Sequence, residues 1–106
     1  IMSVGGRGIV SVASNEMPSE MSRMVECAEQ GDFAAARRLH TGLLPLMQIN
    51  FVESSPIPVK CAMAAMGLLE GVSRLPLVPP RPASRERILQ VLERLGIEVG
   101  ASVRRR

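Results

Sequence analysis

Aromatic side chains are almost absent from this 106-residue chain, which has no Trp, no Tyr and two Phe. Surfaces that stack nucleic-acid bases and cages that bind quaternary ammonium groups both need several aromatic rings. The composition therefore argues strongly against both classes of binding site. The pI of about 9.7 does not restore a nucleic-acid function, because the basic residues are scattered among acidic ones and Arg104, Arg105 and Arg106 end the chain.

Metal-binding and disulfide motifs are missing as well. The chain has one His and two cysteines, Cys27 and Cys61, with no CxxC pair, which excludes a zinc finger or ribbon and a disulfide framework. We expect reduced thiols, as in a cytoplasmic protein. No apolar run is long enough to span a bilayer, and the first residues lack the basic stretch of a signal peptide. Because the chain begins at Ile1, we expect it to start inside a longer polypeptide.

The remaining composition predicts a packed core. Hydrophobic residues make up 46% and charged residues 22% of the chain, which is long enough for one domain or for one piece of a larger domain. Residues 8–13 are β-branched and apolar on both faces, which predicts a strand buried in a parallel sheet. A lone strand leaves its backbone groups unpaired. We therefore expect partner strands that these residues do not contain.

Two helical segments follow the predicted strand. Apolar residues recur at helical spacing over residues 18–30, and Gly31 suits the position after a helix end. Asp32 is suited to cap the second helix. Pro45 lies inside that helix and should kink it without ending it, because the apolar period continues beyond the proline. The predicted apolar stripe of the second helix consists of Phe33, Ala36, His40, Leu43 and Met47.

Prolines and glycines delimit two further helices. Residues 54–60 form the entry to a helix that ends at Gly67 and Gly71. The prolines within residues 75–82 predict an extended segment. Ser84 is suited to cap a last helix, which closes at Gly96. No second strand is predicted, so the chain by itself should be mostly α-helical.

Few side chains suggest catalytic or ligand-binding chemistry. The glycine-rich residues 5–8 precede the predicted strand, whereas a dinucleotide-binding loop follows a strand, so a tight turn is the favoured interpretation. His40 has no Cys or carboxylate at a metal-ligand spacing, which favours a packed or partly solvated side chain over a catalytic or metal-binding one. Cys27 and Cys61 are interpreted as small buried hydrophobes, and Lys60 as a member of a salt bridge, with a functional role as the less favoured alternative. We predict neither a metal site nor a cofactor site.

One buried strand followed at once by a helix is typical of the last βα unit of a larger α/β fold. In a (β/α)₈ barrel, the active site lies at the C-terminal ends of the strands, on the loops that follow them. Residues 14–16 would then face such a site. Because they hold no catalytic triad or carboxylate pair, we expect them to contribute backbone and shape.

Several stretches resemble the dihydrodipicolinate synthase and N-acetylneuraminate lyase superfamily. Residues 5–15 resemble its last barrel strand, and residues 31–37 resemble its glycine-x-aromatic-x-x-Ala-Arg link. Residues 51–60, FVESSPIPVK, are the most specific stretch and favour the synthase branch, whose run ends in Asn-Pro-Ile-Pro-Val-Lys. Ser55 stands in place of the usual Asn. Residues 74–77, followed by Pro79, match the arginine-leucine-proline segment, so that the resemblance extends over residues 4–97.

The resemblance implies class I aldolase-type chemistry. In the synthases a barrel lysine forms a Schiff base with pyruvate, a tyrosine relays protons, and the enamine attacks aspartate semialdehyde in lysine and diaminopimelate biosynthesis. Those residues, a threonine pair and a substrate-binding arginine lie upstream in the family, so we expect no catalytic residue here, and Lys60 is not the Schiff-base lysine. Only Val10 is implied at the site, where its backbone carbonyl lines the pyruvate pocket. The resemblance implies no cofactor.

The predicted architecture is α/β, the C-terminal part of a (β/α)₈ barrel followed by a helical subdomain. We expect the last strand and its helix in residues 1–31, the helical subdomain in residues 32–97 and a flexible basic tail in residues 98–106. The expected partners are the rest of the barrel, pyruvate, aspartate semialdehyde and further copies in a cytoplasmic homotetramer, with neither nucleic acid nor membrane. The rival hypothesis is a small all-α interaction or oligomerisation module without catalytic activity.

Overall fold

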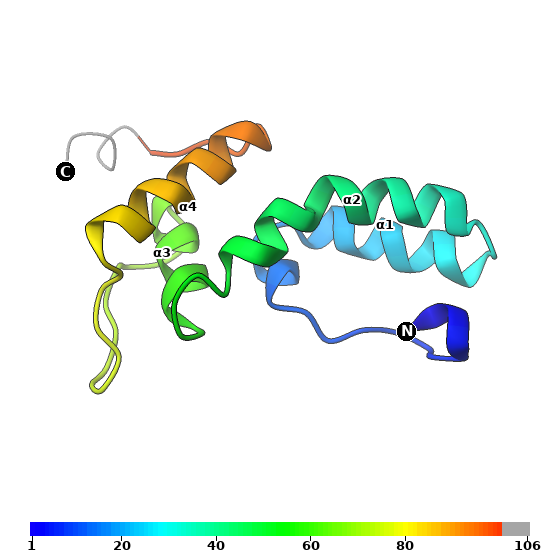
Figure 1. Cartoon of the computed structure of the whole chain (residues 1–106), viewed down its shortest axis with the longest axis horizontal. Helices are drawn as coiled ribbons and strands as arrows, with labels where there is room; N and C mark the ends of the chain where they lie inside the picture. The colour runs from blue at the N-terminus through cyan, green and yellow to red at the C-terminus, as the bar shows by residue number, and fades with distance from the viewer. Residues whose placement is uncertain (101–106) are drawn as a thin grey trace. The chain divides into compact units, whose positions relative to one another are not determined.

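The computed structural model describes residues 1–100. The elements, in chain order, are the 3₁₀-helices η1 (Met2–Val4) and η2 (Val12–Asn15) and the α-helices α1 (Pro18–Glu29), α2 (Phe33–Ile49), α3 (Ile57–Ala65) and α4 (Pro82–Arg94) (Figure 1). Within the described residues no strand is present, and no helix is long and apolar enough to cross a membrane. The chain by itself is helical, as predicted.

The strand predicted over residues 8–13 does not form. Residues 6–11 run without regular structure, Ser11 is extended at φ −144° and ψ 134°, and Val12 already begins η2. The physical reason is the lack of a partner, because a strand exists only when its N–H and C=O groups pair with a second backbone. The extended shape follows from the local sequence, whereas the pairing depends on strands that residues 1–100 do not include.

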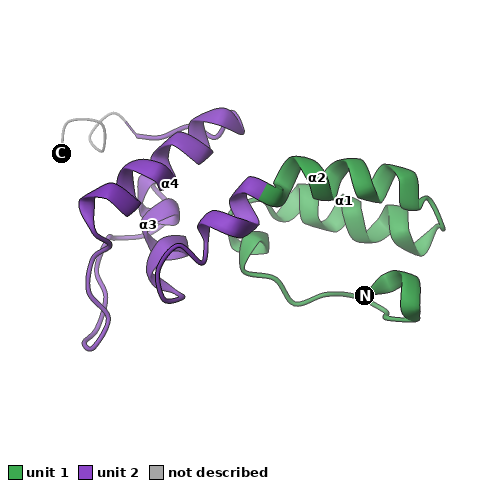
Figure 2. Cartoon of the chain, viewed as in Figure 1, with its two compact units in different colours: residues 1–44 green, residues 45–106 purple. Residues whose placement is uncertain are grey.

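The chain divides into two compact units, residues 1–44 and residues 45–106 (Figure 2). In the first unit, η1 and η2 pack against α1. Gly31, at φ +78°, follows the end of α1, and the Asp32 N–H donates to the Cys27 carbonyl at 2.8 Å. The Ala35 N–H donates to Asp32 Oδ1 at 2.9 Å. The predicted glycine stop and the predicted Asp32 cap are both confirmed.

Helix α2 continues through Pro45 to Ile49, as predicted. The buried face of this helix differs from the predicted stripe, because Ala36, Leu43 and Leu46 are buried while His40 is exposed. His40 is therefore wrongly assigned to the apolar stripe. It lies about 60° around the helix from Leu43, at the edge of the buried face, where an imidazole remains in water.

In the second unit α3 packs against α4. Gly67 at φ +79° and Gly96 at φ +70° follow the ends of these two helices, and the Ile97 N–H donates to the Leu92 carbonyl at 2.9 Å, which is the Schellman pattern. The residues that form the buried core of this unit are Leu46, Ile49, Val59, Ala62, Ala65, Ile88 and Leu92.

The start of α4 corrects one prediction. The helix begins at Pro82, with Arg81 as the N-cap residue, rather than after Ser84. Proline is favoured at a first helical position because its missing N–H would have no partner there. The capping group comes from elsewhere in the chain, since the Arg81 N–H donates to Glu53 Oε1 at 3.0 Å.

The C-terminal residues return to α3. The Gly100 N–H donates to the Ala65 carbonyl at 3.0 Å, so one residue of the predicted tail, Gly100, has a backbone partner. Residues 101–106, the remainder of that tail, lie outside the described residues.

Glu53 should make the stability of the chain depend on pH. A hydrogen bond from the Ser84 side chain and one from the Arg81 N–H hold the pKa of the Glu53 carboxyl below its usual value. The ionised Glu53 carboxylate therefore stabilises the fold fully above about pH 4.3, the pKa of an unfolded Glu. This stabilisation is lost as the pH falls through the lower pKa of Glu53 in the folded chain. We expect Glu53→Gln to remove this part of the pH dependence and to lower the melting temperature at neutral pH by a few degrees.

Thermal melts followed by circular dichroism between about pH 3 and pH 7 check this prediction. Glu86→Gln is the matched control, because Glu86 is an exposed carboxylate on α4, the helix whose N-cap residue Glu53 contacts. Equal pH profiles for Glu53→Gln and the unsubstituted chain would rule out the capping role.

Candidate functional site

Val10 lies in the extended segment 6–11 and is fully exposed, at 105% of its reference area. Its neighbours Ile9 and Ser11 line a groove of about 380 Å³ together with Met21 and Val25 of α1. Successive side chains of an extended chain point to opposite faces, so Val10 points away from α1.

A tight turn, η2, follows this segment directly. Ser14 donates twice to the Ser11 carbonyl, from its N–H at 3.3 Å and from its hydroxyl. Asn15 Nδ2 donates to the Val12 carbonyl at 3.0 Å, and the Glu16 N–H donates to the Ala13 carbonyl at 3.1 Å. The three carbonyls after Val10 are thus held by groups of the same turn. The sequence predicted a backbone contribution from residues 14–16 but did not identify these side-chain hydrogen bonds.

The other candidate side chains lie elsewhere. His40 is exposed on α2, and Cys27 on α1 and Cys61 on α3 are half-buried free thiols. Burial raises the pKa of the Cys61 thiol, which makes it a poor nucleophile near neutral pH. Across residues 1–100, no group of three or more His, Cys, Asp or Glu side chains is arranged to hold a metal ion.

Lys60 is the only lysine of the chain. Its Nζ donates to the Val72 carbonyl at 2.8 Å, so that the first turn of α3 is tied to the loop that follows the helix. The predicted salt bridge is thus replaced by a hydrogen bond to the backbone, because the chain turns back at Gly67 and brings a carbonyl within reach. This contact gives Lys60 a structural role.

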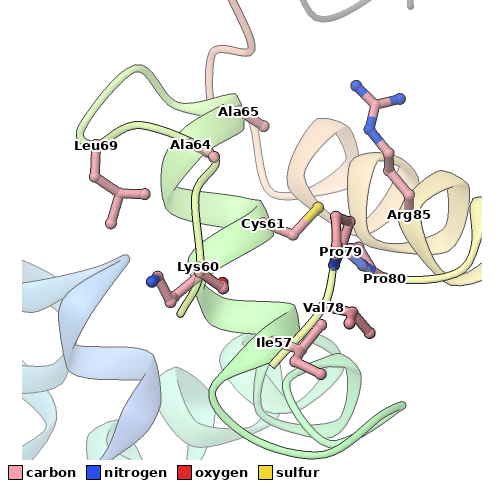
Figure 3. A pocket seen from close by; sticks show the side chains of 12 residues that line it. Ile57, Lys60, Cys61, Ala64, Ala65, Leu69, Val78, Pro79, Pro80 and Arg85 are labelled. Atoms are coloured by element: carbon pink, nitrogen blue, oxygen red, sulfur yellow. The ribbon is translucent and has the colours of Figure 1, made fainter. Parts of the chain in front are cut away.

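A second cavity, of about 410 Å³, lies in the unit formed by residues 45–106. Figure 3 shows the Cys61 thiol beside Pro79, with the charged ends of Lys60 and Arg85 directed away from it. The walls are mostly aliphatic, and they include Ile57, Ala64, Leu69, Val78, Pro79 and Pro80. This cavity offers apolar packing rather than a set of catalytic groups.

The order of elements points to one class of protein, the (β/α)₈ barrels. The relevant elements are the extended segment, the η2 turn, α1 and the helices that follow. The extended segment and α1 correspond to the last βα unit of such a barrel, and the helices that follow correspond to the helical subdomain after it. More particularly, the chain belongs to the Dihydrodipicolinate synthetase family, which it matches over residues 1–95.

Known structures and sequences resemble the chain over nearly all of its length. The dihydrodipicolinate synthase of Aquifex aeolicus superposes with a TM-score of 0.91 at 37% identity, over 92% of this chain and 33% of that one. The chloride-inhibited enzyme of Acinetobacter baumannii, complexed with pyruvate, has a TM-score of 0.88 at 38% identity, again over 92% and 33%. The 4-hydroxy-tetrahydrodipicolinate synthase of Koribacter versatilis is 48% identical over 103 residues, which are 97% of this chain and 34% of that protein.

The chain thus spans about a third of the length of the relatives it matches. Membership of this family favours the barrel hypothesis over the small all-α module.

Proposed function

We propose that this chain is the C-terminal part of a class I aldolase-type lyase that condenses pyruvate with aspartate semialdehyde. The product is 4-hydroxy-tetrahydrodipicolinate, on the way to lysine and diaminopimelate. The match of residues 1–95 to the family carries the proposal, and the activity named for the Koribacter versatilis relative agrees with it. The pyruvate bound by the Acinetobacter baumannii relative supports pyruvate as one substrate.

In this proposal the covalent steps use groups outside residues 1–106. Imine formation needs a lysine amine, and the proton relay of the family needs a tyrosine. The chain has no Tyr, and Nζ of its only lysine, Lys60, donates to the Val72 carbonyl. The contribution of the chain to the site is therefore the backbone carbonyl of Val10, which faces the pyruvate pocket and is followed directly by the hydrogen-bonded turn η2.

The proposed partners are the rest of the barrel and further copies of the protein. Residues 6–11 run without regular structure and have no strand partner within residues 1–100, while each strand of a closed barrel pairs on both edges. We place the last strand and its helix in residues 1–31, the helical subdomain in residues 32–97 and the tail in residues 98–106. The assembly is a cytoplasmic homotetramer that needs no metal or cofactor.

A chimeric enzyme tests the proposed function. In this chimera the present chain replaces the matched segment of the Koribacter versatilis synthase, to which it is 48% identical over 103 residues. We expect the chimera to fold and to keep kcat/KM for pyruvate within about ten-fold of the parent, equivalent to about 1.4 kcal/mol of transition-state stabilisation. The parent without the segment is the control and should be inactive. A folded, correctly assembled chimera without activity would contradict the proposal.

A further inference from the structure

The side chains of Ser14 and Asn15 form a pair of hydrogen bonds with the backbone that follows Val10. Both residues are exposed, and both donate to a carbonyl three residues earlier in the chain, Ser14 to Ser11 and Asn15 to Val12. An exposed hydroxyl or amide is satisfied equally well by water. Burial of polar groups therefore does not explain these two hydrogen bonds, whereas control of the backbone geometry does.

The two carbonyls that these side chains hold belong to the first two peptide groups after the Val10 carbonyl. Ser11 is extended, with ψ 134°, and the next residue, Val12, begins a 3₁₀ turn. The backbone therefore changes from extended to helical after Ser11, one residue beyond Val10. A donor on each of these two carbonyls restricts the rotation of the peptide groups at this change.

We propose that Asn15, assisted by Ser14, is a positioning residue for pyruvate. By holding the Val12 carbonyl it fixes the η2 turn, and through the turn it fixes the direction of the Val10 carbonyl toward the substrate. This inference rests on the proposed function and extends it to the residues that orient the one carbonyl this chain contributes to the pocket. Asn15 itself touches no substrate in this proposal.

The inference predicts a selective loss of pyruvate binding in the chimera. Asn15→Ala and Asn15→Asp both remove the amide donor, and we expect either change to raise KM for pyruvate about three- to ten-fold, the effect of losing one hydrogen bond. KM for aspartate semialdehyde should stay within about two-fold, because the Val10 carbonyl contacts only pyruvate. Ser14→Ala should have a smaller effect in the same direction, because the Ser14 N–H still donates to the Ser11 carbonyl.

Asn15→Ser is the conservative variant that distinguishes positioning from a general effect on folding. A serine hydroxyl reaches a carbonyl three residues back, as Ser14 already does, so Asn15→Ser should restore KM for pyruvate to within about two-fold of the unsubstituted chimera. Melting temperatures of all variants, which should agree within a few degrees, are the folding control. An unchanged pyruvate KM in Asn15→Ala, or an equal rise for both substrates, would overturn the inference.

Hydrogen exchange on the 106-residue chain separates this inference from the proposed function. The Glu16 and Met17 amides donate to the Ala13 carbonyl at 3.1 and 3.0 Å, and both should exchange faster in Asn15→Ala but not in Asn15→Ser. Equal exchange in all three chains would overturn the positioning role, whatever the chimera does. An inactive unsubstituted chimera would instead overturn the proposed function.

Discussion

Val10→Pro in the chimera should abolish turnover, whereas Val10→Ile and Val10→Leu should leave kcat/KM within a few fold of the unsubstituted chimera. A backbone carbonyl survives a change of side chain, and larger aliphatic side chains in a packed barrel cost about 1–3 kcal/mol. Proline removes the N–H that a central strand needs and fixes φ near −65°. The carbonyl is then displaced, and a shift of about 1 Å near the reacting atoms costs ~10²-fold in rate.

The measurement for this series is kcat and KM for pyruvate, with circular dichroism as the folding control. Val10→Leu is the informative control, because its side chain differs from that of valine while its backbone retains the N–H group. The assignment of a backbone role to Val10 is wrong if Val10→Leu folds normally and yet loses activity as completely as a parent synthase without its Schiff-base lysine.

Lys60→Met in the chimera should keep kcat within about three-fold, because Lys60 forms no imine. The substitution removes the exposed hydrogen bond from Lys60 Nζ to the Val72 carbonyl, and a typical intramolecular hydrogen bond contributes about 0.5–1.5 kcal/mol to stability. The expected loss is therefore one of stability rather than of rate. The isolated chain, with Lys60 as its only lysine, should show no turnover.

Melting temperature and kcat, measured on the same preparations, separate the two effects. Lys60→Arg is the matched variant, because it keeps a charged donor on a long side chain and should lose less stability than Lys60→Met. A folded Lys60→Met chimera with kcat reduced by about 10³-fold or more, the scale expected when a covalent step is removed, would contradict the structural role of Lys60.

The helix ends were predictable because their signals are local. Gly31 and Gly96 adopt positive φ values of +78° and +70°, which glycine reaches without a steric penalty. Asp32 accepts a hydrogen bond from the Ala35 N–H three residues later in the chain. Each of these features depends on a few neighbouring residues, and so a single sequence is enough to place them.

The features that the sequence did not predict depend on distant residues or on absent ones. Glu53 caps α4 from 28 positions earlier in the chain, and Lys60 reaches Val72 across 12 positions. Neither contact corresponds to a recognisable short-range pattern in the sequence. The predicted strand does not form for a related reason. Pairing requires a second strand, whereas the extended conformation of Ser11 requires only its own segment.

The candidate site was predicted only in part. The resemblance to a known family predicts that Val10 lies at the pyruvate pocket, and residue spacing alone identified no catalytic group. The hydrogen bonds of Ser14 and Asn15 were not predicted. Ser and Asn side chains bond to nearby carbonyls in many turn types, so the sequence alone does not specify which carbonyl accepts. Their targets become definite only once η2 is formed.

The central claim is that this chain contributes a backbone carbonyl to the pyruvate pocket but not the lysine that forms the imine. Its most direct test is to locate the lysine on which pyruvate is trapped. The chimera and the isolated chain are each incubated with pyruvate, reduced with borohydride and mapped by peptide mass spectrometry. We predict one reduced pyruvate adduct in the chimera, on a lysine of the Koribacter versatilis portion, and none on Lys60 of either protein. A reduced pyruvate adduct on Lys60 would contradict the claim.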